Sequence, residues 1–221
     1  MNAKINTLDK VIIKESASVL GFQYQPIYNS RMNSIQFYEV VSNFSSGFND
    51  ELYIEDINEM ASKLNCIRKI LFSKKSGVSG FVAVKINLSF LMDYFFVQRL
   101  LSFRNVNIAV EVCNLKKNID SDTIVYNITV LQKSGIMVWL SDYHKNSEQA
   151  NLSFGKISWD MIKVGKSFLY HNDFDATEAL YYVLKPFTQY GLIFEGVETP
   201  KQAEIIRSIG EFGQGGFYCS S

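Results

Sequence analysis

The sequence is poor in cysteine, proline and histidine, with three, three and two of them in 221 residues. The cysteines, Cys66, Cys113 and Cys219, are widely separated and form no CxxC or Cys/His spacing, which argues against a zinc site. A reduced, intracellular setting fits this usage best. Because the chain also lacks a Pro/Gly linker and an internal repeat, we expect one domain over residues 1–221.

Net charge is absent too, since Lys plus Arg and Asp plus Glu both number 22. Without a basic excess, no overall field would hold a polyanion, so direct nucleic-acid binding is not expected. Charged residues interrupt the N-terminal segment, which excludes a signal peptide, and the most apolar stretch, residues 90–103, is too short to span a bilayer. We therefore expect a soluble, cytoplasmic protein that does not contact a membrane.

Hydrophobic residues make up 47% of the chain, which is ample for one large core, and short β-branched or aromatic runs alternate with longer helical patterns. The expected strands are Gly21–Tyr28, Ser34–Val41, Phe81–Leu88, Asn107–Cys113, Ile136–Ser141, Met161–Val164, Leu192–Glu195 and Gln214–Tyr218. The expected helices are Asn49–Lys74, Phe90–Phe103, Asp120–Lys133, Asp175–Gln189 and Lys201–Ser208. Eight strands, most of them parallel, favour a TIM-like (β/α)8 barrel over an open doubly wound sheet.

Three local signals refine this pattern. Residues 29–33 are too few for a crossover helix, so the first two strands must run antiparallel. Pro186 should end or kink the helix that contains it, whereas Thr199 and Pro200 form a typical helix start. Apolar residues at roughly helical spacing predict an N-terminal helical segment over residues 1–20, which would close the barrel floor.

Polar side chains follow the ends of six different predicted strands. They are Glu39, Asn87, Glu111, Asp142, Lys163 and Glu195. The carboxyl ends of barrel strands meet at the face that carries active sites, and this many charged groups suit a core poorly. Oxygen ligands of this kind favour Mg²⁺ or Mn²⁺ over zinc. The strand ends therefore predict a metal-dependent site at the barrel mouth.

Several short motifs occur in a fixed order along the chain. They are Tyr24-Gln25-Pro26-Ile27, Glu39-Val40-Val41, Asn87-Leu88-Ser89, Glu111-Val112-Cys113-Asn114, Lys163-Val164-Gly165, Glu195-Gly196-Val197-Glu198-Thr199 and Gln214-Gly215. This series resembles the motifs of the EAL-domain phosphodiesterases, which hydrolyse the bacterial second messenger cyclic di-GMP. The resemblance implies a barrel of EAL type with one antiparallel strand near its N-terminus.

The resemblance also implies a role for each site residue in a two-metal centre, where cations on both sides of the phosphodiester offset its developing charge. Glu39, Asn87 and Glu111 would hold the first metal, and Asp142 would serve the second. Lys163 would orient water, and Glu195 would be the general base. Glu198 and Gln214 would support that base.

Four positions depart from the family pattern. They are Ser141 in place of a metal-bridging Asp, Asn43 in place of a phosphate-binding Arg, Asn114 in place of a loop-anchoring Glu, and Gly165 in place of an Asp. A neutral hydroxyl cannot neutralise a pair of dications, and an amide cannot grip a phosphate as a guanidinium does. The loop 144–149 also lacks the family's glycines. His144 in that loop is either a substitute ligand or an ordinary loop residue.

The resemblance and its departures together predict a degenerate, catalytically inactive EAL-like protein. We expect it to act in bacterial signalling through a protein partner, for example in motility, adhesion or virulence gene expression, as degenerate members do when they bind transcription regulators. It would then require no cofactor, and cyclic di-GMP binding is not favoured. The alternatives are a residual cyclic di-GMP phosphodiesterase that uses Mg²⁺ or Mn²⁺, or a cyclic di-GMP receptor. Members of the family commonly dimerise, which leaves a homodimer open.

Overall fold

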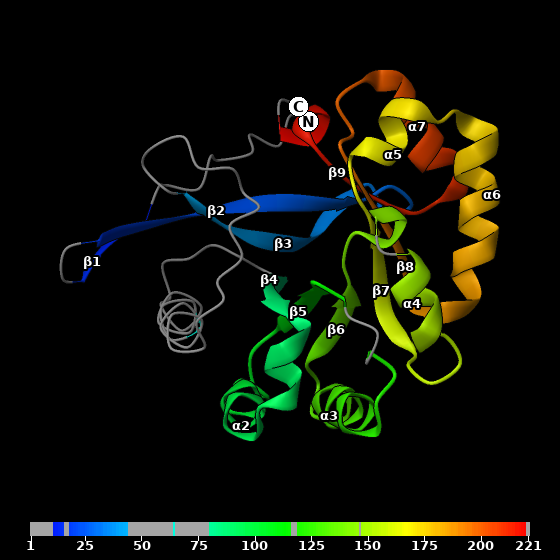
Figure 1. Cartoon of the computed structure of the whole chain (residues 1–221). Helices are drawn as coiled ribbons and strands as arrows, with labels where there is room; N and C mark the ends of the chain where they lie inside the picture. The colour runs from blue at the N-terminus through cyan, green and yellow to red at the C-terminus, as the bar shows by residue number, and fades with distance from the viewer. Residues whose placement is uncertain are drawn as a thin grey trace.

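The computed structural model describes residues 11–15, 18–43, 64, 80–115, 119–145 and 147–219, with side chains described from residue 24 onward except at 42, 43 and 219. In these ranges nine strands form one sheet, which closes because β2 pairs with β9 as well as with β3. Strands β2 to β9 make the barrel, and helices cover its outside (Figure 1). The predicted barrel is confirmed, and the rival open sheet is wrong.

Among the strands that the structure describes, one, β2, runs in the opposite direction to the others. They are β1 (Val11–Glu15), β2 (Ser18–Asn29), β3 (Ser34–Asn43), β4 (Phe81–Asn87), β5 (Ile108–Cys113), β6 (Met137–Leu140), β7 (Trp159–Val164), β8 (Thr188–Glu195) and β9 (Phe212–Gln214). Strands β3 to β9 run parallel, whereas β2 is antiparallel to β1, β3 and β9. The short link between β2 and β3 predicted this antiparallel pair.

Helices fill most of the connections between parallel strands. They are η1 (Leu88–Met92), α2 (Tyr94–Leu101), α3 (Asp122–Lys133), η2 (Tyr143–Lys145), α4 (Ser147–Ser153), α5 (Ser167–His171), α6 (Phe174–Leu184), η3 (Lys185–Phe187), α7 (Pro200–Ile209) and α8 (Gly216–Cys219). Helix α7 begins as predicted, because the Thr199 side chain accepts from the backbone of Gln202 in a capping box. None of the described helices has the length and apolar character needed to cross a membrane.

The prediction of a helix over residues 1–20 is wrong for the part that the structure describes. Val11–Glu15 and the beginning of β2 form an antiparallel hairpin in which Glu15 lies opposite Ser18. Residues 11–13 are β-branched in succession, and such side chains lose rotamer freedom in a helix but fit a strand. Residues 1–10 lie outside the described ranges.

Other predicted elements differ from the structure in their boundaries, and one lies outside the described residues. The strand expected at Gln214–Tyr218 ends at Gln214, because Gly215 turns the chain so close to Val197 that an added Cβ would lie 2.4 Å from its carbonyl oxygen. The helix expected at Asp175–Gln189 stops before Pro186, as that proline predicted, and its last residues enter β8. The helix expected at Asn49–Lys74 lies outside the described residues apart from Leu64.

The barrel interior holds its own apolar cluster, separate from the larger one between strands and helices. This interior cluster consists of Ile27, Phe37, Ala83, Ala109, Met137, Trp139, Met161, Ile193 and Phe212. The Phe37 ring meets Trp139 edge-on, with centroids 5.3 Å apart, and Phe212 at 5.4 Å. The cluster fills the middle of the barrel and thereby fixes the orientation of the next residues along each strand.

Candidate functional site

A charged layer lies inside the barrel next to the interior cluster. Alternate residues of a strand face the same side, so the residue two places after an interior apolar side chain also points inward. This rule gives the inward positions at the carboxyl ends: Glu39 after Phe37, Lys85 after Ala83, Glu111 after Ala109, Ser141 after Trp139, Lys163 after Met161, Glu195 after Ile193 and Gln214 after Phe212. The structure therefore brings most of the predicted site residues to one barrel mouth.

Lys163 is the centre of this layer. Its Nζ lies 2.6 Å from Glu39 Oε2, 3.2 Å from Glu111 Oε2 and 2.6 Å from Glu195 Oε1. The side chain is almost wholly buried, which opposes its charge, but the three carboxylates raise the pKa of Lys163 well above its usual value. An ammonium group has three hydrogens to donate, and here each has a carboxylate within reach. Lys163 is thus fully charged and fully engaged.

Glu111 is completely buried and is held by three side chains. Its Oε1 accepts from Ser141 Oγ at 2.5 Å and lies 3.5 Å from Lys85 Nζ, while Oε2 faces Lys163. Burial opposes the ionised form, but Lys163 and Lys85 outweigh it and hold the pKa of Glu111 at about 2. Glu111 is therefore ionised at neutral pH and balanced by cations from the protein itself.

Gln214 links the strands at which the barrel closes. It is in register with Glu195 on β8, yet its Nε2 donates to Glu39 Oε2 at 2.8 Å and to Gln25 Oε1 at 3.0 Å. These bonds join β9 to β2 and β3. The predicted supporting residue thus contacts Glu39 directly.

Asn87 lies at the end of β4, and its amide oxygen is already bonded. Asn114 Nδ2 donates to Asn87 Oδ1 at 2.5 Å. Asn114 adopts a left-handed backbone with φ of 51°, a conformation that asparagine tolerates better than most residues. The substituted position 114 therefore binds the side chain that was expected to be a metal ligand.

Asp142 and His144 occupy the loop after β6. His144 Nδ1 accepts from the Gly165 backbone N–H at 3.1 Å, and its Nε2 lies 2.5 Å from Ser167 Oγ. A Cβ at position 165 would lie 2.4 Å from Asp142 Oδ1 and 2.6 Å from His144 Cε1, so a larger residue here would require these two side chains to move. Burial lowers the pKa of His144, which favours the neutral ring that these bonds require. Both ring nitrogens hold the loop, which opposes the interpretation of His144 as a substitute ligand.

Two other predicted positions lie at the margin of the mouth. The exposed Glu198 accepts from the Gly216 backbone N–H at 3.2 Å and so joins the segments after β8 and β9. Asn43 is the last residue of β3, and its side chain is outside the described set. In this structure Glu198 therefore stabilises the backbone at the edge of the mouth.

Lys85 is the residue that the sequence motifs did not single out. It stands between Ala83 and Asn87 on the inward face of β4 and is in register with Glu111 on β5. Glu111 is the main cause of the raised pKa of Lys85. Strand alternation could have found it, because every second residue of Phe81–Asn87 shares one face.

The side-chain oxygens expected to bind the first metal of a two-metal centre do not fit that role in this structure, because protein groups already occupy them. Both oxygens of Glu111 face protein donors, as does Oε2 of Glu39, and Asn87 accepts from Asn114. Within the described ranges, no three His, Cys, Asp or Glu side chains are grouped so as to hold a metal ion. Ser141 adds a donor to the site and no negative charge.

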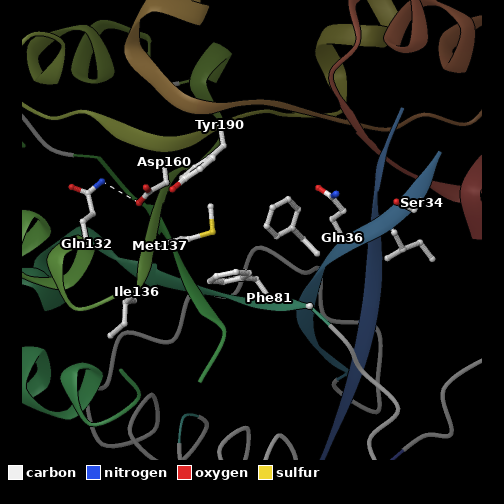
Figure 2. Close-up of a pocket in the computed structure, with 12 residues that line it drawn as sticks. Ser34, Gln36, Phe81, Gln132, Ile136, Met137, Asp160 and Tyr190 are labelled. Atoms are coloured by element: carbon white, nitrogen blue, oxygen red, sulfur yellow. Dashed lines mark hydrogen bonds between the residues drawn. The ribbon is translucent and has the colours of Figure 1, made fainter. Parts of the chain in front are cut away.

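A pocket of about 680 Å³ lies at the other end of the barrel, at the first residues of β3, β4 and β6. Figure 2 shows its lining, in which Gln132 Nε2 donates to the buried Asp160 carboxylate at 3.0 Å. Because none of the predicted site residues lines it, this pocket is separate from the charged mouth.

Comparison with known sequences gives one family. The sequence profile described as EAL domain matches residues 14–221. Among curated proteins, no match is found.

Solved structures show the same fold at low sequence identity. The EAL domain of Mycobacterium smegmatis DcpA matches with a TM-score of 0.70 and 18% identity, over 92% of this chain and 90% of that one. Klebsiella pneumoniae BlrP1, in complex with manganese and cyclic di-GMP at pH 6, matches with a TM-score of 0.72 and 16% identity, over 94% and 57%. The EAL enzyme Bd1971, bound to cAMP and cyclic di-GMP, gives 0.64 and 18%, over 89% and 60%. The chain thus spans about six tenths of the latter two proteins.

Proposed function

The chain belongs to the EAL domain family, and on that premise we propose that it is a catalytically inactive member that regulates bacterial signalling through contact with a protein partner. The observation that best supports the absence of catalysis is the hydrogen bond from Ser141 Oγ to Glu111 Oε1. A hydroxyl at this position donates a hydrogen bond to the carboxylate, whereas a bridging carboxylate would add negative charge between two cations.

The charge balance of the mouth supports the same proposal. Lys163 and Lys85 offset two of the three negative charges of Glu39, Glu111 and Glu195, and Asp142 Oδ1 lies 3.8 Å from Lys145 Nζ. A dication placed among these ion pairs would meet two buried or half-buried ammonium groups. The lysines thus already supply part of the positive charge that these carboxylates would otherwise need from a metal.

Exposed aromatic side chains support a role in protein contact. Tyr94 is 67% exposed and Phe95 77% exposed at the beginning of α2, next to Met92 at 51%. Helix α2 packs beside α3 on the outside of the barrel (Figure 1). Large apolar side chains grouped on a surface are typical of interaction sites. We name Met92, Tyr94 and Phe95 the α2 patch.

The loss of catalysis is tested by incubating the purified protein with cyclic di-GMP and Mg²⁺ or Mn²⁺ and measuring the linear dinucleotide. We expect no product above that of the Glu195→Gln variant, which controls for contaminating enzymes. Product that depends on Glu195 would establish a residual phosphodiesterase instead. Nucleotide binding without product, measured by calorimetry, would establish a receptor.

The partner contact is tested by capture from a lysate of the source bacterium. We expect a protein that is retained by the wild type and by Tyr182→Ala, which removes an exposed aromatic on α6, but is lost by Phe95→Ala. Equal retention by both variants would exclude the α2 patch as the contact surface. Failure of the wild type to retain any protein would count against the regulatory role.

A further inference from the structure

Lys85 is an unusual residue for the inside of a barrel mouth. It lies on the inward face of β4, its Nζ is 3.5 Å from Glu111 Oε1, and 30% of its side chain is exposed while none of Glu111 is. We propose that Lys85 replaces a metal ion in this chain: its ammonium group supplies, at Glu111, the positive charge that a bound divalent cation would otherwise supply.

The backbone register sets up this contact. Lys85 and Glu111 are direct partners across the parallel strands β4 and β5, so their side chains leave neighbouring positions on the same face. The lysine therefore reaches Glu111 without any rearrangement of the loops above the mouth. Because the pairing is part of the barrel itself, the charge at this point is permanent.

Glu111 needs this second cation because Lys163 is shared. The Lys163 ammonium group lies within 3.2 Å of Glu111 Oε2 but is closer, at 2.6 Å, to both Glu39 and Glu195. One positive charge thus faces three carboxylates, and a completely buried carboxylate requires strong compensation. Lys85 adds a second positive charge beside Glu111 Oε1, whereas Lys163 contacts Oε2.

The same arrangement excludes a divalent cation. Glu111 Oε1 would have to exchange both Ser141 and Lys85 for the metal, and the displaced ammonium group would stay nearby. Even with the dielectric constant of water, a unit positive charge about 5 Å from a dication weakens its binding by roughly tenfold. An acidic residue at position 141 is therefore insufficient to restore a metal site as long as Lys85 is present.

Mn²⁺ titration by calorimetry, with electron paramagnetic resonance as a second readout, tests this inference. The proteins are the wild type, Ser141→Asp, and Ser141→Asp combined with Lys85→Met or with Lys85→Arg as the matched control that keeps the charge. We expect the Met double variant to bind Mn²⁺ at least about tenfold more tightly than both Ser141→Asp and the Arg double variant. Equal affinity of the Met and Arg double variants would overturn the proposal.

A second measurement covers the case in which the double variants fold poorly. Lys85→Met alone leaves Glu111 short of a cation, so Mn²⁺ should raise its thermal unfolding temperature but not that of the wild type or Lys85→Arg. Equal shifts in all three proteins would again overturn the proposal. The inference rests only on the inactive part of the proposed function. Hydrolysis by the wild type would reject that part, whereas equal Mn²⁺ affinities in an inactive protein would reject the role of Lys85 alone.

Discussion

Two neighbouring layers inside the same barrel differ in what holds them together. The interior cluster around Trp139 is apolar and gains its stability from burial, in proportion to the apolar area removed from water. The layer around Lys163 consists of buried charges that are tolerated only because opposite charges lie in contact. The apolar layer contains no charged side chain, so its stability does not depend on ionisation, whereas the charged layer is unbalanced by the loss of any one member.

The largest expected effect is the loss of the central cation. Lys163→Met keeps an unbranched side chain of similar shape but leaves Glu39, Glu111 and Glu195 facing one another, and we expect a loss of about 5 kcal/mol in the free energy of unfolding. Urea unfolding measures it. The matched control is Lys201→Met, at an exposed position of α7, which should change stability by less than about 0.5 kcal/mol.

Equal stability of the Lys163→Met and Lys201→Met variants would show that the carboxylates find other partners, and the distinction between the two layers would then be lost.

The apolar layer should respond to volume. Trp139→Ala opens a cavity in the interior cluster, so we expect a loss of about 4 kcal/mol, measured by the same unfolding experiment. Trp139→Phe should cost less than about 1.5 kcal/mol, because most of the volume remains and the indole Nε1 has no hydrogen-bond partner to lose. A Phe variant as unstable as the Ala variant would contradict this account.

Acid should weaken the charged layer specifically. The pKa of Glu111 is lowered from its ordinary value of 4.5 to about 2, so the unfolded chain binds more protons between these values and stability is lost as the pH falls through that window. The stabilisation present above pH 4.5 is about 3 kcal/mol. The free energy of unfolding of the wild type and of Glu111→Gln is measured at pH 5 and pH 3. The variant should lose less of this free energy between the two pH values than the wild type. A parallel loss in both proteins would assign the acid sensitivity to other groups.

The smallest expected effect has the opposite sign and lies at the other end of the barrel. Burial raises the pKa of Asp160 above its ordinary 3.8 despite its hydrogen bonds to Val138 N and Gln132, so the folded protein binds the extra proton. Stability from this group is present below pH 3.8 and falls as the pH rises through the folded pKa. The wild type should lose this advantage over Asp160→Asn as the pH is raised. A growing advantage would show that the pKa of Asp160 is lowered instead.

Sequence patterns predicted the barrel because its elements obey strong local rules. Strand β5 is buried along its whole length, and its continuous apolar pattern, interrupted only by Glu111, predicts a central parallel strand. The short link before β3 predicted the antiparallel pair. The N-terminal hairpin was missed because β1 and β2 are specified by their pairing, whereas the spacing of isolated apolar residues is ambiguous.

The charged mouth was predictable in position but not in connectivity. Strand ends and motifs placed Glu39, Glu111, Lys163 and Glu195 together, since carboxyl ends of barrel strands share one face. The partners of each carboxylate depend on distances across the barrel, which no local pattern encodes. For the same reason Lys85 was missed, and the space that Gly165 leaves for His144 could be found only in three dimensions.

We propose that the carboxylates of the mouth take their positive countercharge from lysines of the protein itself and not from metal ions. Calorimetric titration of the wild-type protein with Mn²⁺, in the absence and presence of cyclic di-GMP, tests it most directly. We expect no saturable Mn²⁺ binding under either condition and no linear dinucleotide at the end of the titration. Saturable binding of two Mn²⁺ ions that strengthens with cyclic di-GMP, together with its hydrolysis, would contradict it.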